Sequence, residues 1–156
     1  MEQIADALAR LRGRRIYIDA NIFIYFFDRS PGYFDLVSQV LTACAAHQSF
    51  AVTGEAAVAE VMVGVYRQNS PVLTAKIKEF FARKDLLLVT LHDKDAFDLA
   101  AMLAAKERMK LIDALHLATA ARSGCAALLT NDAGIKPIEG VEIVRLSDFA
   151  PVPGAA

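Results

Sequence analysis

The stretch RIYIDANIFIYFF, residues 15–27, is where the fold and the candidate site can first be read. Ile16, Tyr17 and Ile18 form a short apolar run typical of a strand, and Asp19 follows them shortly before a second apolar run. A carboxylate at the end of a buried strand is unfavourable unless it is hydrogen-bonded, paired or bound to a cation. Ligands of open parallel sheets bind at the carboxyl ends of the strands, so Asp19 is the first candidate site residue. The alternative is that Asp19 only caps a helix beginning at Ala20, with Asn21 as a polar neighbour.

Strands and helices are predicted to alternate along the chain. Apolar runs predict strands at 15–18, 49–53, 86–91, 126–130 and 141–146, and helical spacing predicts helices at 2–12, 22–27, 33–47, 54–68, from 71 onward, 93–110 and 112–123. No two strands are joined by a hairpin turn, which implies a parallel sheet covered by helices. We therefore predict an α/β fold, a three-layer α/β/α sandwich around a central parallel sheet of about five strands. One domain is expected over residues 1–150, with a flexible tail over 151–156.

The composition favours a compact globular protein. Hydrophobic residues make up 55% of the 156 residues and charged residues 22%, which argues against disorder. No apolar run is long enough to cross a membrane and the first residues lack the apolar segment of a secretory signal, so we expect a cytoplasmic protein. The net charge of −1 neither indicates nor excludes a nucleic-acid partner. Cys44 and Cys125 lack metal-binding spacing and are expected to be buried, reduced thiols.

Three further acidic residues lie in apolar surroundings. Glu60 lies in AVAEVMVGV, in the helix after the second predicted strand, Asp113 lies at the start of a helix in LIDALHLATAA, and Asp132 follows the fourth strand in ALLTNDAG. Each has a structural alternative, since the two aspartates could be caps or turn formers and Glu60 could lie on a solvated helix face. All of them, however, can meet Asp19 at one edge of the predicted sheet. Carboxylates gathered there repel one another unless they share a hard cation such as magnesium or manganese.

This arrangement of carboxylates fits metal-assisted hydrolysis of a phosphodiester. One or two such ions polarise the phosphate, lower the pKa of a bound water and neutralise the leaving oxygen. His116, three residues after Asp113, lies on the same helix face as that carboxylate. We expect His116 to be a packed, hydrogen-bonded side chain rather than a catalytic base, because a metal-bound water already supplies the nucleophile.

Four short motifs resemble those of the PIN domain family. They are IDANIFIY, AEV in the helix after the second strand, IDALHLATAA and LLTND, and their order and span, about residues 15–149, match that family. The compact form is similar to the VapC-type toxins of bacterial toxin–antitoxin pairs. By this resemblance the family's acidic metal-site quartet, with its catalytic role, corresponds to Asp19, Glu60, Asp113 and Asp132. Asn21 and Asn131 correspond to polar neighbours that orient the quartet.

The resemblance also implies an activity and partners. It implies a magnesium-dependent or manganese-dependent endoribonuclease that cuts RNA. Such a protein is commonly a homodimer and is inhibited by a small antitoxin whose tail covers the acidic pocket. One feature departs from the compact toxins, which often begin close to the first strand, whereas this chain has a helix ahead of it.

Other activities fit the sequence less well. A phosphatase with an aspartyl nucleophile requires a second aspartate two residues after the first, where this chain has Asn21. A phospho-acceptor receiver domain could account for Lys136 and Pro137 but requires paired acids after the first strand. Dinucleotide and nucleoside-triphosphate binding lack their glycine-rich loops. The remaining alternative is a non-catalytic PIN-like scaffold that binds protein or RNA, because fold does not fix function.

Overall fold

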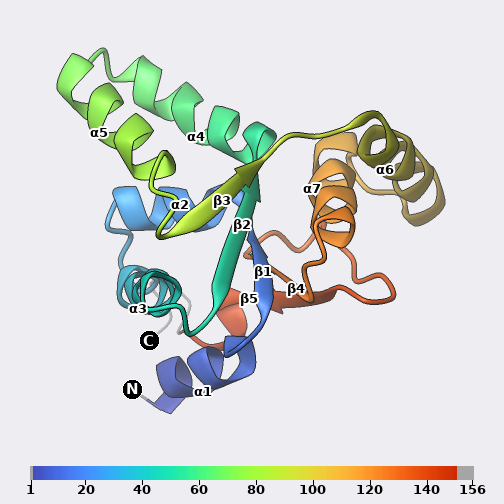
Figure 1. Ribbon diagram of the computed structural model, residues 1–156, viewed down its shortest axis with the longest axis horizontal. Coiled ribbons are helices and arrows are strands. Elements are labelled where there is room, and N and C mark those ends of the chain that lie inside the picture. The colour runs from blue at the N-terminus through green and yellow to red at the C-terminus, as the bar shows by residue number, and fades with distance from the viewer. Residues whose placement is uncertain (1, 151–156) are drawn as a thin grey trace.

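A parallel sheet forms the middle layer of the protein, here described over residues 2–150 in a computed structural model (Figure 1). Its five strands lie in the order β3-β2-β1-β4-β5. Every neighbouring pair is parallel, with Ile16 of the central strand opposite Ala51 on one side and Ala127 on the other. The prediction of a parallel sheet is confirmed. The strands are β1 (Arg15–Ile18), β2 (Phe50–Gly54), β3 (Leu87–Thr90), β4 (Ala127–Thr130) and β5 (Glu142–Arg145).

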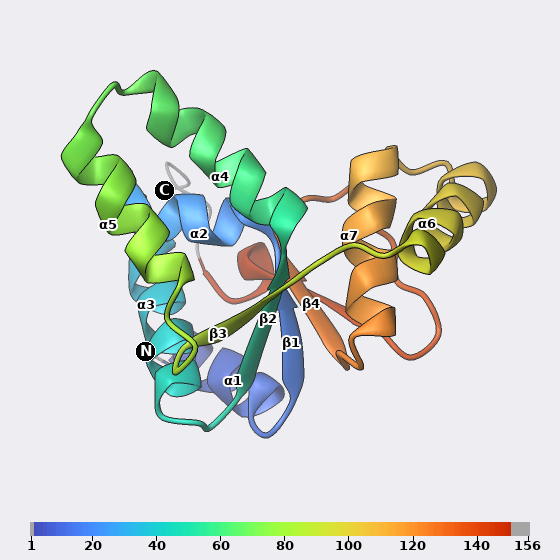
Figure 2. The ribbon, with the colours of Figure 1, turned by 45° about the horizontal axis from the view of Figure 1, so that its top comes forward.

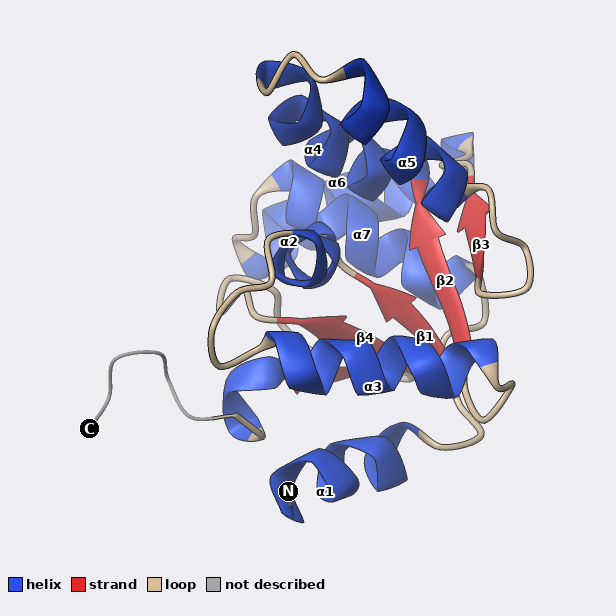
Figure 3. Ribbon diagram, turned by 90° about the vertical axis from the view of Figure 1, so that its left-hand side faces the viewer, coloured by secondary structure: helices blue, strands red, loops and turns tan. Residues whose placement is uncertain are grey.

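Helices cover both faces of this sheet, which confirms the predicted three-layer sandwich (Figures 1 and 3). Side chains alternate along β1, so Ile16 and Ile18 contribute to one core and Tyr17 to the other. The first core is covered by α1 (Glu2–Leu11), α2 (Ala20–Phe27), α3 (Phe34–Ala45), α4 (Glu55–Arg67) and α5 (Pro71–Phe81). The second is covered by α6 (Lys94–Glu107) and α7 (Leu111–Arg122), and a short 3-10 helix, η1 (Leu146–Asp148), follows β5.

The predicted elements are all present, and their boundaries differ by a few residues. The helix predicted over 22–27 begins at Ala20, because Asp19 caps it. The helix predicted over 93–110 ends at Glu107, because Arg108 adopts a left-handed conformation with φ 54°. The predicted tail, 151–156, lies outside the described residues.

Helix α1 is packed into the fold rather than appended to it. Leu11 is buried in the core, and the guanidinium of Arg14 donates to Glu142 of β5 at 2.6 Å. Arg10 pairs with the same carboxylate, its Nε lying 2.8 Å from Oε1. These two arginines hold the pKa of Glu142 below its usual range. The first helix is therefore fixed to the last strand of the sheet.

The carboxyl ends of β1, β2 and β4 open onto a region between two helix pairs. Figure 2 shows α4 and α5 on one side of these strand ends and α6 and α7 on the other.

The two cysteines are buried and unpaired, as predicted, and burial raises the pKa of each thiol to about 11. Across residues 2–150, no helix is both long enough and apolar enough to cross a bilayer.

Candidate metal centre

Asp19 is a buried carboxylate held by several donors. It lies between the end of β1 and the start of α2, with 5% of its surface exposed. Its Oδ1 accepts the Ala20 N–H at 2.7 Å, and its Oδ2 accepts the Thr130 hydroxyl at 2.7 Å and the Asn21 amide at 3.3 Å. Burial raises the pKa of Asp19 above its usual range, and His116 and the Thr130 hydrogen bond oppose that rise. The carboxylate caps α2, and its Oδ1 also faces Nε2 of His116 at 3.8 Å.

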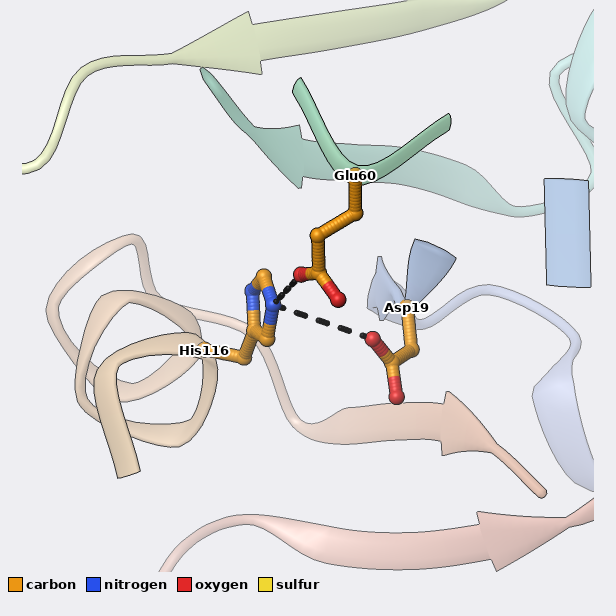
Figure 4. A group of neighbouring side chains, drawn as sticks. All are labelled: Asp19, Glu60 and His116. Carbon is orange, nitrogen blue, oxygen red and sulfur yellow. Dashed lines mark hydrogen bonds and ion pairs between the residues drawn. The ribbon is translucent and has the colours of Figure 1, made fainter. Parts of the chain in front are cut away.

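Glu60 and His116 meet Asp19 at the strand ends (Figure 4). Glu60 extends from α4, and its Oε1 lies 2.6 Å from Nε2 of His116 on α7. The same Nε2 lies 3.8 Å from Oδ1 of Asp19, and the potential ligand atoms of the three residues all lie within 4.8 Å of one another. Asp19 and His116 are buried, whereas the Glu60 side chain is 44% exposed. The group is therefore closed on the sheet side and accessible to solvent at Glu60.

His116 is packed and hydrogen-bonded, as the sequence predicted. It is 1% exposed, and its Nδ1 lies 2.7 Å from the hydroxyl of the fully buried Tyr17. The sequence prediction did not include His116 among the ligands, although it placed this residue on the same helix face as Asp113. In the structure its Nε2 points at two carboxylates, which adds a nitrogen to the candidate ligand set.

Asp113 and Asp132 form a second pair of acids beside this group. Asp113 lies in the first turn of α7, 8% exposed, and Asp132 follows β4. A methyl group placed on Gly134 would lie 3.1 Å from Oδ1 of Asp132 and 3.5 Å from Oδ2 of Asp113, so both carboxylates border the same space. Burial raises the pKa of Asp113, and the charges of Asp132 and Asp19 raise it further. The pair lies outside the three-residue group but acts on it electrostatically.

The two asparagines bridge the strand ends. Asn21 donates to Asp19 at 3.3 Å and accepts the backbone N–H of Asn131 at 3.2 Å. Asn131 donates to the Tyr25 hydroxyl at 3.3 Å and accepts the backbone N–H of Ser147 at 3.1 Å. These bonds hold the α2 side of the site to the loop after β4.

Thr130 is a supporting residue that the sequence did not reveal. Its hydroxyl is fully buried, donates to Asp19 at 2.7 Å and accepts the backbone N–H of Asp132 at 3.0 Å. It also accepts from the Asn21 amide at 3.3 Å. In the sequence it is one more β-branched residue at a strand end, so only the pairing of β4 with β1 shows its role.

The side chains present suit a divalent cation. Carboxylate oxygens are the ligands that magnesium and manganese prefer, and imidazole nitrogen is a common ligand of first-row transition ions. Burial raises the pKa of Asp113 most, and the charges of Asp132 and Asp19 raise it further, so these three carboxylates repel one another. A cation among them would offset that repulsion and the burial of Asp19. Such a centre can hold a water molecule and a phosphate oxygen together.

Comparison with known proteins gives a family and a fold. The PIN domain family model matches residues 16–141, which is most of the chain and includes every candidate site residue. No curated protein matches the chain.

Several solved structures share the fold at low sequence identity. A toxin–antitoxin complex from Klebsiella pneumoniae is similar with a TM-score of 0.65 and 23% identity, over 81% of this chain and 94% of that one. VapBC2 from Rickettsia felis, bound to a promoter DNA fragment, is similar with a TM-score of 0.67 and 16% identity, over 84% of this chain and 98% of that one. VapC20 of Mycobacterium tuberculosis, a sarcin-ricin loop cleaving toxin, is similar with a TM-score of 0.61 and 10% identity, over 72% of this chain and 86% of that one. Helix α1 precedes the family match.

Proposed function

Because this chain belongs to the PIN domain family, we propose that it is a divalent metal-dependent endoribonuclease and the toxin of a toxin–antitoxin pair. The observation that carries the proposal is the buried Asp19, placed at the end of the central strand within 4.8 Å of ligand atoms of Glu60 and His116. A divalent ion explains why a carboxylate is placed there. The similar structures from Klebsiella and Rickettsia, a toxin–antitoxin complex and VapBC2, support the biological setting.

In this proposal Asp19, Glu60, Asp113 and Asp132 form the catalytic metal site for magnesium or manganese. The bound ion would supply a Lewis acid that polarises the phosphodiester and lowers the pKa of a water molecule. Thr130 and Asn21 fix the Asp19 carboxylate through its Oδ2, and Asn131 fixes Asn21. Glu60, the most exposed of the three grouped side chains, would face the RNA substrate.

The antitoxin would bind beside this site. A groove of about 220 Å³ is lined by residues of α2, α4 and α5, and Glu60 is one of them. Its apolar lining includes Ile24, Phe27, Val61, Val65, Leu73 and Ile77. We expect an apolar antitoxin segment in this groove and a basic residue inserted among the acids, because an ion-free acidic cluster attracts positive charge. By its resemblance to the family we expect a homodimer, and we propose that the protein acts in the cytoplasm.

The activity is tested on a mixed RNA pool incubated with magnesium, manganese or EDTA. We expect internal cuts with either ion and none with EDTA, and calorimetry should record ion binding. The non-catalytic scaffold predicts neither cleavage nor ion binding, so a folded protein that shows neither would overturn the proposal.

For the antitoxin, a cognate partner should bind far more weakly to a variant in which three of the acids are changed to amides. Equal binding to that variant would exclude insertion of a basic residue.

A further inference from the structure

His116 places an imidazole nitrogen in a site otherwise made of carboxylates. Its Nε2 lies 2.6 Å from Oε1 of Glu60 and 3.8 Å from Oδ1 of Asp19. We infer that His116 Nε2 is a direct ligand of the ion, together with Asp19 and Glu60, and that it makes the site prefer manganese or cobalt to magnesium. This inference rests on the metal dependence in the proposed function. Its physical basis is that imidazole binds transition ions well, whereas magnesium favours oxygen ligands and water.

The surroundings of the ring suit a ligand. A ligating histidine usually donates its second ring N–H to a fixed partner, which sets the tautomer and the ring orientation. Here that partner is the buried Tyr17 hydroxyl, 2.7 Å from Nδ1, with the ring centroids 5.7 Å apart. Because β1 directs Tyr17 into the α6–α7 core, the phenol reaches α7 directly beneath His116. Tyr17 therefore acts as a positioning residue.

Tyr17 can satisfy the ring both with and without an ion. Nε2 lies 2.6 Å from Oε1 of Glu60 and Nδ1 lies 2.7 Å from the Tyr17 hydroxyl, so both ring nitrogens have a partner when no ion is bound. If Nε2 bound an ion, the ring proton would be on Nδ1, where the Tyr17 oxygen at 2.7 Å could accept it. A phenol both donates and accepts, so Nδ1 keeps a partner in either tautomer.

The other two histidines of the chain are placed differently. His92 is hydrogen-bonded to no carboxylate, since its Nε2 accepts the Ala56 N–H at 3.0 Å and its Nδ1 lies 2.7 Å from the Thr119 hydroxyl. His47 is exposed and lies between α3 and β2, at the amino edge of the sheet. An imidazole signal from a bound ion can therefore be assigned to His116.

The test is pulsed electron paramagnetic resonance of the whole protein loaded with manganese, which detects a directly bound nitrogen. We expect a nitrogen coupling in the parent and in His47→Asn, an exposed control whose φ of 58° suits asparagine. We expect none in His116→Gln, which offers an oxygen in place of the ring. Calorimetry with cobalt, manganese and magnesium should show His116→Gln losing at least about tenfold in transition-ion affinity, with a smaller change for magnesium. Tyr17→Phe should keep the coupling and lose about 10- to 100-fold in manganese affinity.

The outcomes separate this inference from the proposed function. A parent protein that binds manganese and cuts RNA but shows no nitrogen coupling would overturn the inference and leave the nuclease intact. A parent protein that binds none of cobalt, manganese and magnesium would overturn both the inference and the proposed function. Because the parent spectrum alone decides whether nitrogen is bound, the test does not depend on His116→Gln folding. A coupling that persists in a folded His116→Gln protein would also overturn the assignment.

Discussion

Replacing Asp19 by asparagine separates the two roles of this residue. Asparagine caps a helix about as well as aspartate, so the bond from the Ala20 N–H, 2.7 Å in the parent, should survive. The amide nitrogen then occupies the place of Oδ2, which accepts from Thr130 and Asn21 in the parent. A helix-cap role alone predicts a small effect on folding and none on activity. The metal-site role predicts that folding survives and activity does not.

The structure gives the size of each effect. Loss of two hydrogen bonds to Oδ2 destabilises by about 1–3 kcal/mol at about 0.5–1.5 kcal/mol each. Removing a buried charge whose pKa is raised by burial opposes that loss, so in EDTA the variant should lie within about 2 kcal/mol of the parent. An ion at a hundred times its Kd stabilises the parent by about 2.7 kcal/mol, or roughly 5–10 °C in Tm, and the variant should lose most of this. Removing a group that stabilises transition-state charge lowers the rate by about 10²- to 10³-fold.

The assay combines thermal melting and RNA cleavage of parent and Asp19→Asn, each in EDTA and in saturating manganese or magnesium. The expected result is nearly equal melting in EDTA, a metal-induced rise in Tm for the parent only, and cleavage reduced by orders of magnitude in the variant. A stable variant that keeps both the metal-induced rise and the parent cleavage rate would refute the reasoning. Asp19 would then be a helix cap.

Four other changes test the supporting structure. Thr130→Val removes a buried hydroxyl that makes several hydrogen bonds, so it should lower the free energy of unfolding, measured in denaturant, by about 1–3 kcal/mol. The control Thr53→Val removes a hydroxyl that makes one hydrogen bond and should cost less. Equal losses in the two variants would contradict this. Gly134→Ala should leave melting unchanged but lower cleavage about tenfold, because the new methyl group crowds the acid pair; unchanged cleavage would show that the pair tolerates displacement. Gly64→Ala, inside α4, adds a methyl group that meets no atom within 4 Å beyond its chain neighbours and the backbone of its own helix. It should raise the free energy of unfolding by about 0.5–1 kcal/mol, and a lower Tm would be the contrary result. In EDTA the raised pKa of Asp113 makes the stability depend on pH: its stabilising contribution is complete below the ordinary pKa of 3.8 and is lost as the pH rises through the folded-state pKa. The stability of the parent relative to Asp113→Asn should therefore fall with rising pH. A difference that does not change with pH would refute the shift.

The fold was predictable because local pattern and global topology agree in this chain. Strand β4 is apolar up to Thr130 and is buried at every position, as a strand covered on both faces must be. The helix boundaries were less predictable, because they depend on backbone conformations that the residue types do not signal. Arg108 ends α6 with a positive φ, although arginine is a good helix former. The start of α2 depends on the capping bond of Asp19, which sequence analysis treated as the alternative to a site.

The candidate site was predictable in part, for a topological reason. Acids that follow parallel strands must gather at one edge, which is why Asp19 and Asp132 could be placed together from the sequence. The contacts of His116 and Thr130 were not predictable, because they depend on register and on helix placement. Tyr17 reaches His116 only because β1 turns that side chain toward α7, and Thr130 reaches Asp19 only because β4 lies beside β1. The sequence spacing of 99 residues between Tyr17 and His116 carries no signal of that contact.

The choice between a nuclease and a binding scaffold depends on the charge at the strand ends. A scaffold needs α2 capped and the loop after β4 held, and asparagine at position 19 would do both without burying a charge. Instead the chain buries a carboxylate there, surrounds it with donors, and adds three more acids, two of which border one space. Without a cation this arrangement opposes folding, since burial and mutual repulsion raise the pKa of Asp113 and burial raises that of Asp19. A divalent ion would turn the same repulsion into binding energy, and a bound ion can activate water for phosphodiester hydrolysis. The unfavourable charge is therefore the reason to propose an enzyme rather than a scaffold.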